Sequence, residues 1–304
     1  MDDTLLQVEE IDFSYSESYR ALRKVSVAFA EGEMVAILGS NGAGKSTFFL
    51  CCNGVLRPQS GSLYYRGKKI TDKKEDILTL RQGVGLVFQD PDSQIIAGKV
   101  ESEVSFGPMN LRLSEEEVKR RVDEALKQMN ITQYRDFAPQ YLSGGEKKRV
   151  SIADILAMSP SMILLDEPTA SLDPQNSEAL EALLNELNRA GITIVISTHD
   201  VDFAYRIARR VIVFSEGCIL ADDTPEKVFA ATEVLKQAGL KRPLLYEVYE
   251  SLKQTLSKPE GHSDPDASGA DARPKTIAEF KNYLDRRQCS LYRLPKDQGP
   301  GSLG

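Results

Sequence analysis

Short runs of apolar residues, bounded by glycine, proline and charged residues, recur along the first two-thirds of this chain. Runs of this length that are rich in β-branched and aliphatic residues are typical of strands buried within a sheet. We predict strands at residues 5–15, 25–29, 34–38, 61–67, 84–88, 162–165, 192–196 and 211–214.

Helical patterns lie between these strands. Ser114 to Glu117 form a capping-box sequence, and the apolar residues that follow recur at helical spacing as far as Met129. We also predict helices at 143–158 and at 174–189, the second with a proline near its start. Because strands alternate with helices, we expect an α/β domain that is built around a largely parallel sheet.

The pattern changes after Asp223, where we expect the α/β domain to end. Residues 224–256 have the periodicity of amphipathic helices, whereas 257–275 are rich in Pro, Gly, Ser and Asp and are typical of a linker. Residues 277–284 fit one more short helix. The predicted organisation is therefore a domain at 1–223, a helical appendage at 224–256, a linker at 257–275 and a tail at 276–304.

Composition narrows the class of protein. With 304 residues and 41% hydrophobic content, the chain can bury a full core. Its net charge of −7 argues against a nucleic-acid binder that works through a broad basic face. No apolar run is long enough to span a bilayer, and the acidic start argues against export. The four cysteines lack C-x-x-C spacing, and we expect them to be structural or incidental in a reducing cytosol: Cys51, Cys52, Cys218 and Cys289.

The sequence from Gly39 to Thr47 has the pattern G-x-x-x-x-G-K-[ST] between a predicted strand and a helix-compatible stretch. The glycines allow successive N–H groups to turn toward phosphate oxygens. Lys45 is suited to reach the β- and γ-phosphates, and the Ser46 hydroxyl can bind Mg²⁺. We predict a nucleotide triphosphate site made of Gly39, Ser40, Asn41, Gly42, Ala43, Gly44, Lys45, Ser46 and Thr47.

Two carboxylates, Asp166 and Glu167, follow the apolar run 163–165. In α/β folds, ligands bind at the carboxyl ends of the strands. Asp166 is suited to hold Mg²⁺ through water, and Glu167 is suited to polarise the attacking water as a general base. A strand that merely ends in solvated acids is the alternative, and the phosphate loop upstream disfavours it.

The sequence Leu142-Ser143-Gly144-Gly145-Glu146 precedes a predicted helix. Such a helix start makes an anion site, although it is also typical of an ordinary turn and cap. Here the chain resembles the ATP-binding-cassette (ABC) ATPases, whose signature sequence it closely matches. The resemblance implies a phosphate-loop core with an antiparallel β subdomain and an α-helical subdomain at about 90–160. It also implies that two domains pair head to tail, with Ser143, Gly144, Gly145 and Glu146 of one closing on the γ-phosphate of the other.

The resemblance covers residues 5–222 and extends to further functional positions. Tyr15 matches the aromatic residue that stacks on adenine, although it also fits an ordinary strand tyrosine. Gln89 matches the glutamine that contacts Mg²⁺ and senses the transmembrane partner. Ser171-Leu172-Asp173 matches the loop that crosses the dimer interface, and His199 matches the histidine that contacts the γ-phosphate and orients Glu167. The implied cofactors are ATP and Mg²⁺, the metal being held by Ser46, Gln89 and Asp166.

Within the ABC proteins, several stretches look like the energy-coupling-factor importers, especially the cobalt-type ATPase subunit. These stretches are 87–95, 103–111, 114–118, 142–150 and 238–243. The last lies in the helical appendage at 224–256, which resembles the dimerisation region that helps hold the two ATPases together. In such transporters, a segment after the glutamine loop grips arginine-bearing coupling helices of a membrane scaffold. Glu101 and Glu103 are candidate acidic partners, or else solvated surface acids. The resemblance implies a subunit at the cytoplasmic face of the cell membrane, with a scaffold and a separate specificity subunit for cobalt, nickel or a vitamin.

The alternative from another class is a soluble ABC ATPase that acts on nucleic acid or ribosomes. Such chains usually carry two cassettes, or a coiled coil that splits the cassette, together with basic patches. This chain has one uninterrupted cassette and an acidic balance, so we expect no nucleic-acid partner. His262, Asp264 and Asp266 fit linker residues better than a metal site.

Overall fold

The computed structural model describes residues 4–170, 172–256 and 273–291, and the fold is set out for this part of the chain. It divides into two compact units, one ending at Lys241 and the other beginning at Arg242. The predicted end of the α/β domain at Asp223 lies within the first unit.

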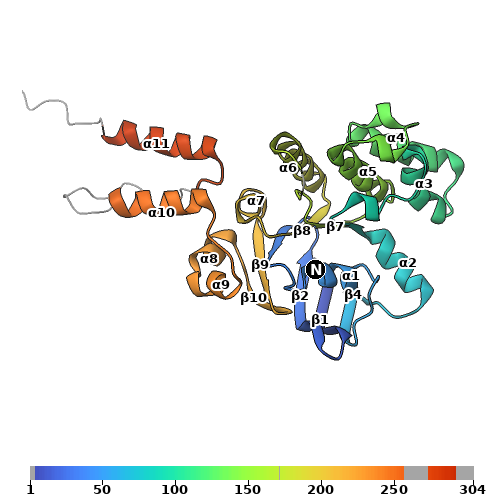
Figure 1. Cartoon of the computed structure of the whole chain (residues 1–304), viewed down its shortest axis with the longest axis horizontal. Coiled ribbons are helices and arrows are strands. Elements are labelled where there is room, and N and C mark those ends of the chain that lie inside the picture. The colour runs from blue at the N-terminus through green and yellow to red at the C-terminus, as the bar shows by residue number, and fades with distance from the viewer. Residues whose placement is uncertain (1–3, 171, 257–272, 292–304) are drawn as a thin grey trace, which may run out of the picture. The chain divides into compact units, whose positions relative to one another are not determined.

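Ten strands are described in the first unit, and they form two sheets (Figure 1). They are β1 (Thr4–Ser16), β2 (Tyr19–Ala30), β3 (Met34–Leu38), β4 (Ser60–Tyr65), β5 (Lys68–Lys69), β6 (Val84–Val87), β7 (Met162–Asp166), β8 (Thr193–Thr198), β9 (Arg210–Ser215) and β10 (Cys218–Asp223). The larger sheet has the order β10–β9–β3–β8–β7–β6, and its pairs are parallel except for β10 with β9. The smaller sheet, β2–β1–β4–β5, is antiparallel.

The helices of the first unit connect and cover these sheets. They are α1 (Lys45–Cys52), α2 (Lys74–Gly83), α3 (Val100–Asn110), α4 (Glu115–Gln128), α5 (Gly144–Ala157), α6 (Pro174–Arg189), α7 (Val201–Ile207), α8 (Pro225–Ala230) and α9 (Thr232–Gln237). Short 3₁₀ turns lie at Pro91–Ser93, Thr132–Tyr134 and Pro139–Tyr141. The predicted helix at 174–189 has the predicted bounds, and that at 143–158 corresponds to α5 with its two caps.

The larger sheet is buried on both faces because successive side chains of its strands point to opposite sides. In β7, Leu164 packs in the core that the two sheets share with α1, whereas Ile163 and Leu165 pack in the core formed with α3 to α6. Helix α1 lies between the sheets, and its Phe48 and Phe49 are fully buried. This two-sided burial explains why the parallel strands are nearly continuous apolar runs in the sequence.

Helices α3, α4 and α5 pack on one another and form a separate group of helices (Figure 1). The hydroxyl of Ser114 accepts from the Glu117 N–H at the start of α4, as predicted. The Glu117 carboxylate binds Arg120 and Arg121 instead of returning to the cap, so only half of the predicted capping box forms. The expected α/β class, with an antiparallel sheet and a helical subdomain beside the core, is confirmed.

The cysteines of α1 are part of the packed core. Cys51 and Cys52 are buried, and burial raises the pKa of the Cys51 thiol to about 12 and that of Cys52 well above its usual range. Neither forms a disulfide in the described structure, which agrees with the structural role expected for them.

The second unit contains α10 (Leu244–Leu256) and α11 (Ile277–Leu291), the latter longer than predicted. The rings of Tyr249 and Tyr283 lie 5.2 Å apart and pack the two helices together. Arg273 donates to the Tyr246 hydroxyl at 2.9 Å and forms an ion pair with Glu250. Most of the predicted linker, including His262, Asp264 and Asp266, lies outside the described residues.

Candidate active site

The phosphate loop connects β3 to α1 and places Lys45 at the first position of the helix. Gly44 has a φ of 105°, and a Cβ there would lie 2.5 Å from the carbonyl oxygen of Ala21, so only glycine fits. The buried Lys45 Nζ donates to the carbonyl oxygens of Gly39 at 2.6 Å and Ser40 at 3.3 Å. Burial lowers the pKa of Lys45, and the nearby carboxylates of Glu167 and Asp166 oppose that effect. A confined ammonium with several donors suits phosphate oxygens.

Glu167 follows Asp166 at the carboxyl end of β7 in an unusual backbone conformation. Its φ of 42° is left-handed, and its N–H donates to the carbonyl oxygen of Ser197 at 2.9 Å. Such strain in a non-glycine residue persists where the surroundings hold it and is frequent at functional sites. The side chain is buried, and its Oε1 lies 3.7 Å from the Lys45 Nζ without a hydrogen-bond donor in the described structure. A buried carboxylate oxygen without a donor is suited to receive a water molecule.

The other carboxylate oxygen of Glu167 is held by the end of β8. Its Oε2 accepts from the Thr198 hydroxyl at 3.2 Å and lies 3.0 Å from the Nδ1 of His199. The His199 side chain is 63% exposed, so the imidazole lies at the surface while its Glu167 partner is buried. The Ser197 hydroxyl donates to Asp166, its partner in the β7–β8 pairing. The parallel register of β7 and β8 therefore brings Asp166, Glu167 and His199 to the same edge of the sheet.

Ser197 and Thr198 belong to this group of side chains, and the sequence prediction missed their role. The sequence did indicate such a role, because both residues end an apolar run and directly precede His199. Because β7 and β8 are parallel neighbours, the polar residues that end both strands meet at one edge of the sheet.

Tyr15 lies at the end of β1 beside the phosphate loop. Its hydroxyl is 3.2 Å from the Thr47 hydroxyl, and its side chain is 53% exposed. Phe13 packs edge-on against it, and the ring of Tyr19 stacks on it at 5.9 Å between centroids. An exposed aromatic surface next to a phosphate loop suits a nucleobase. Tyr19 is a second exposed ring at this place that the sequence prediction missed.

Gln89 follows β6, the parallel neighbour of β7, and so lies at the same edge of the sheet as Asp166. Its side chain is exposed, and its backbone carbonyl oxygen accepts a hydrogen bond from the Lys148 Nζ at 2.7 Å. The position fits a side chain that reaches toward a metal ion near Asp166.

The signature residues begin α5. Ser143 is the N-cap, and the Glu146 carboxylate accepts from the Ser143 N–H at 2.7 Å and from its hydroxyl at 2.8 Å, which completes a capping box. Glu146 therefore stabilises the turn, and the exposed Gly144 follows the cap directly. Among the described residues, no hydrogen bond or ion pair joins 143–146 to the phosphate loop.

Asp173 caps α6 by accepting from the Asn176 N–H and side-chain amide, both at 2.8 Å. These two hydrogen bonds hold the pKa of Asp173 below its usual range. Ser171, in the loop predicted to cross a dimer interface, lies outside the described residues.

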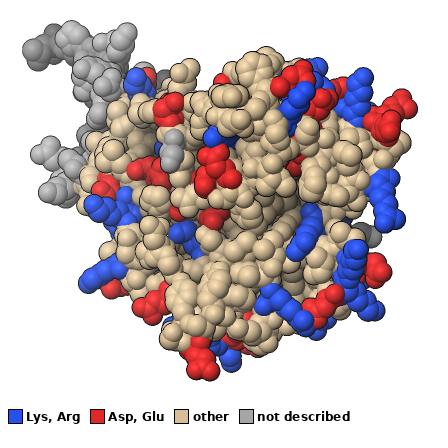
Figure 2. Space-filling model, turned by 45° about the vertical axis from the view of Figure 1, so that its right-hand side comes forward, with Lys and Arg blue, Asp and Glu red and all other residues tan. Residues whose placement is uncertain are grey.

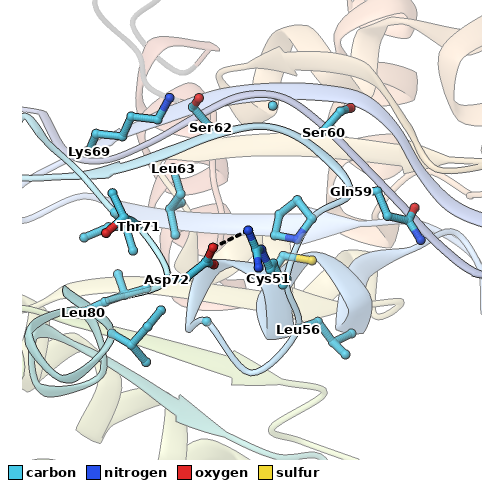
Figure 3. A pocket seen from close by; sticks show the side chains of 16 residues that line it. Cys51, Leu56, Gln59, Ser60, Ser62, Leu63, Lys69, Thr71, Asp72 and Leu80 are labelled. Atoms are coloured by element: carbon cyan, nitrogen blue, oxygen red, sulfur yellow. Dashed lines mark ion pairs between the residues drawn. The ribbon is translucent and has the colours of Figure 1, made fainter. Parts of the chain in front are cut away.

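A hollow of about 360 Å³ lies between the end of α1, β4, β5 and α2 (Figure 3). Leu56, Leu63 and Leu80 give it an apolar lining, and an ion pair joins Arg57 and Asp72 at its rim. None of the predicted site residues lines it. The residues suited to phosphate chemistry therefore gather elsewhere, at the edge of the larger sheet.

Comparison with known proteins agrees with this geometry. A family model described as ABC transporter matches residues 22–170. An energy-coupling factor transporter ATP-binding protein of Methanospirillum hungatei is 41% identical over 99% of this chain and 73% of that protein. Its counterpart in Methanocaldococcus jannaschii is 45% identical over 82% of this chain and 90% of that protein.

Two solved structures are similar to this chain. The cbiO1 protein of Clostridium perfringens, described as part of an ABC transporter complex, is 42% identical with a TM-score of 0.70. The match covers 82% of this chain and all of that one. A dimeric cassette bound to ADP and phosphate is 30% identical with a TM-score of 0.65, over 73% of this chain and 99% of that one. This chain therefore belongs to the ABC transporter family, as an ATP-hydrolysing, Mg²⁺-dependent ATP-binding subunit of the energy-coupling factor type.

Proposed function

We propose that this ATPase pairs head to tail with a second ATPase subunit, identical or paralogous, and that hydrolysis in the pair drives nutrient uptake through membrane subunits. The separation of the two half-sites carries this proposal. Lys45, Glu167 and His199 are joined by direct contacts, whereas Ser143 and Gly144 begin a different helix without contact to them. The solved cassette with 30% identity is itself a dimer with ADP and phosphate.

In the proposed site, each group of this chain has one task. The residues from Gly39 to Thr47 surround the phosphates, and Tyr15 stacks on adenine. Ser46, Gln89 and Asp166 would hold Mg²⁺, which would supply positive charge against the phosphates. The Glu167 Oε1 accepts the proton of the attacking water, since it is buried beside Lys45 and lacks another donor.

His199 and the partner chain complete this arrangement. The Nδ1 of His199 contacts the opposite oxygen of Glu167 and fixes how the carboxylate is turned, while the exposed ring faces the γ-phosphate of the bound nucleotide in our proposal. The signature residues Ser143 to Glu146 and the loop ending at Asp173 come from the other subunit. Hydrolysis then lets the two subunits separate, and the opening is passed to the membrane subunits.

An exposed apolar surface supports a membrane partner. Ile96, Phe106 and Met109 are exposed in and just before α3, close in sequence to the Gln89 segment. Phe106 and Met109 lie three residues apart and therefore share one side of α3, and contiguous exposed apolar surface marks interaction sites. We propose that the integral membrane scaffold docks here, at the cytoplasmic face of the cell membrane. None of the described helices is long and apolar enough to cross a bilayer.

The two acids predicted as partners of scaffold arginines behave differently. Glu103 is only 4% exposed and accepts from the backbone N–H groups of Ile96 and Ala97 at 3.0 and 2.6 Å. The prediction for Glu103 is therefore wrong, because its carboxylate shapes the turn before α3. Glu101 forms an ion pair with Arg135 at 2.7 Å and stays partly exposed, so it remains a candidate contact.

The transported nutrient is inferred from the resemblance to energy-coupling-factor importers alone. We propose a transition-metal ion, cobalt by family resemblance, with nickel or a vitamin as equal alternatives, chosen by a separate specificity subunit. The nucleic-acid alternative finds little support in the charge distribution. Figure 2 shows acidic and basic side chains interspersed over one face of the described residues, with wide uncharged areas between them. Nucleic-acid binders instead gather their basic side chains.

Mixing two defective variants tests the composite site. Lys45→Ala damages the phosphate loop and Gly144→Asp places a carboxylate at the signature, so each variant alone loses both sites of its dimer. In a mixed dimer, the intact loop of one chain meets the intact signature of the other. We therefore expect ATPase activity to return on mixing, and a mixture as inactive as its components overturns the composite site. Recovery of the wild-type chain from native membranes with hydrophobic subunits supports transport, whereas recovery with nucleic acid favours the alternative.

A further inference from the structure

One side of α5 contacts the segment between Phe88 and Gln94, which leads from β6 toward the helical group. The contacting residues of α5 are Lys148, Ser151 and Asp154. Residues three apart lie along one side of a helix, so these contacts form a continuous line. The same helix begins at the signature cap Ser143.

Lys148 makes the innermost of these contacts. Its residue is 2% exposed, and its Nζ donates to the carbonyl oxygens of Phe88 at 2.9 Å and Gln89 at 2.7 Å. In the described structure it forms no ion pair within 4.0 Å, so backbone carbonyls are its acceptors. A buried ammonium is stable only where its hydrogen bonds are satisfied, and charge-assisted bonds are strong and directional. The peptide of Gln89 is therefore fixed to α5.

Gln94 makes a second link to the same place. Its Oε1 accepts from the Phe88 N–H at 3.1 Å, while its Nε2 donates to the Ser151 carbonyl at 3.0 Å and to the Asp154 carboxylate at 3.4 Å. Phe88 is thus held through both its N–H and its carbonyl group. Two independent side chains, one from each segment, tie the residue before Gln89 to α5.

We propose that Lys148 and Gln94 are positioning residues that lock the Gln89 backbone to the signature helix. The inference rests on the proposed function, which assigns Gln89 to the metal and the start of α5 to the nucleotide of the second subunit. A single helix then presents Ser143 to one nucleotide and sets the place of Gln89 at the other.

Removing either link should impair turnover more than nucleotide binding. We expect Lys148→Met to lower kcat about 10-fold or more, because misplacing a catalytic group by an ångström can reduce a rate up to about 100-fold. The KM for ATP should change much less, since the phosphate loop is untouched. The Mg²⁺ concentration for half-maximal rate should rise, and Lys148→Arg should restore part of kcat. Lys119→Met, on the exposed surface of α4, is the matched control.

A double-mutant cycle on the full-length chain tests whether Lys148 acts on turnover through Gln89. If Lys148 acts through Gln89, Lys148→Met in a Gln89→Ala background should lower kcat no further than Gln89→Ala alone. Gln94→Leu provides the same test if Lys148→Met fails to fold. Additive losses, or equal changes in kcat and KM, overturn the inference. A normal kcat in Gln89→Ala instead overturns the proposed role of Gln89, so the two failures can be told apart.

Discussion

The carboxyl edge of the larger sheet and the start of α5 carry the two halves of the proposed site, and they are built in opposite ways. At the sheet edge, Lys45, Asp166 and Glu167 are buried and bound to one another or to the adjacent strand. At the start of α5, Ser143 and Gly144 are exposed, and the Ser143 side chain makes its described hydrogen bonds within the cap, to Glu146. The first half is assembled within one chain. In our proposal, the second half is completed only by the nucleotide of another subunit.

The largest effect is expected at the sheet edge. Glu167→Gln removes the proposed base while keeping the shape of the side chain, and we expect a fall in kcat of about 10³-fold. Dimerisation driven by ATP should persist, which light scattering after size exclusion can follow. Glu186→Gln, exposed on α6, is the control that should keep full activity. ATPase activity like that of the wild type in Glu167→Gln would show that Glu167 is not the general base.

Lys45→Ala tests whether the same half binds the nucleotide on its own. Hydrogen bonds to charged groups contribute about 1.5–3 kcal/mol, so we expect ATP affinity to fall roughly 10- to 100-fold. Calorimetry on the single chain measures this directly. Lys24→Ala, exposed on β2, should bind ATP normally. Unchanged affinity in Lys45→Ala would contradict the loop assignment.

The start of α5 can be compared with an equivalent cap that has no proposed site. Ser143→Ala and Ser114→Ala each remove an N-cap hydroxyl, so both should lower the free energy of unfolding by about 1 kcal/mol. Only Ser143→Ala should also reduce turnover, because only that cap meets a nucleotide in our proposal. Thermal unfolding and ATPase assays on both variants distinguish the two roles, and an equal loss of activity would make the signature a structural cap alone.

The smallest expected effect is a pH dependence of folding stability that arises from Asp154 on α5. Burial, with the nearby charge of Glu103, raises the pKa of Asp154 to about 7. The folded chain therefore binds more protons than the unfolded chain between about pH 4 and pH 7, and this carboxyl lowers stability as the pH rises through that window. Asp154→Asn removes the effect, so it should raise the melting temperature relative to wild type at pH 8 more than at pH 5. An equal change in melting temperature at pH 5 and at pH 8 would contradict the raised pKa of Asp154.

The sequence predicted the regions that long apolar periodicity marks, and it missed those fixed by local or tertiary contacts. The bounds of α6 were predicted because a proline start, a capping aspartate and a regular apolar stripe agree. The strand pattern located β7 and β8, yet only their pairing shows that Ser197 binds Asp166. The short helix α7 was missed, because seven residues hold too few turns for a periodic signal.

Charged residues were the hardest to interpret from sequence. Lys148 and Glu103 stand in polar stretches and look like surface residues, but both are buried and hold backbone groups of the segment around Gln89. Burial of a charge depends on which carbonyl or amide groups the fold brings near, and no local pattern records that. The phosphate loop was predictable for the opposite reason, since its chemistry lies within nine consecutive residues.

The exposed start of α5 has a consequence for how the enzyme behaves before assembly. In our proposal, a chain that carries one complete half-site and one unoccupied half-site binds ATP without hydrolysing it. Its rate per molecule then depends on meeting a partner and rises with protein concentration by mass action. Newly made subunits would keep ATP bound, and the ATP would be hydrolysed only where two subunits pair.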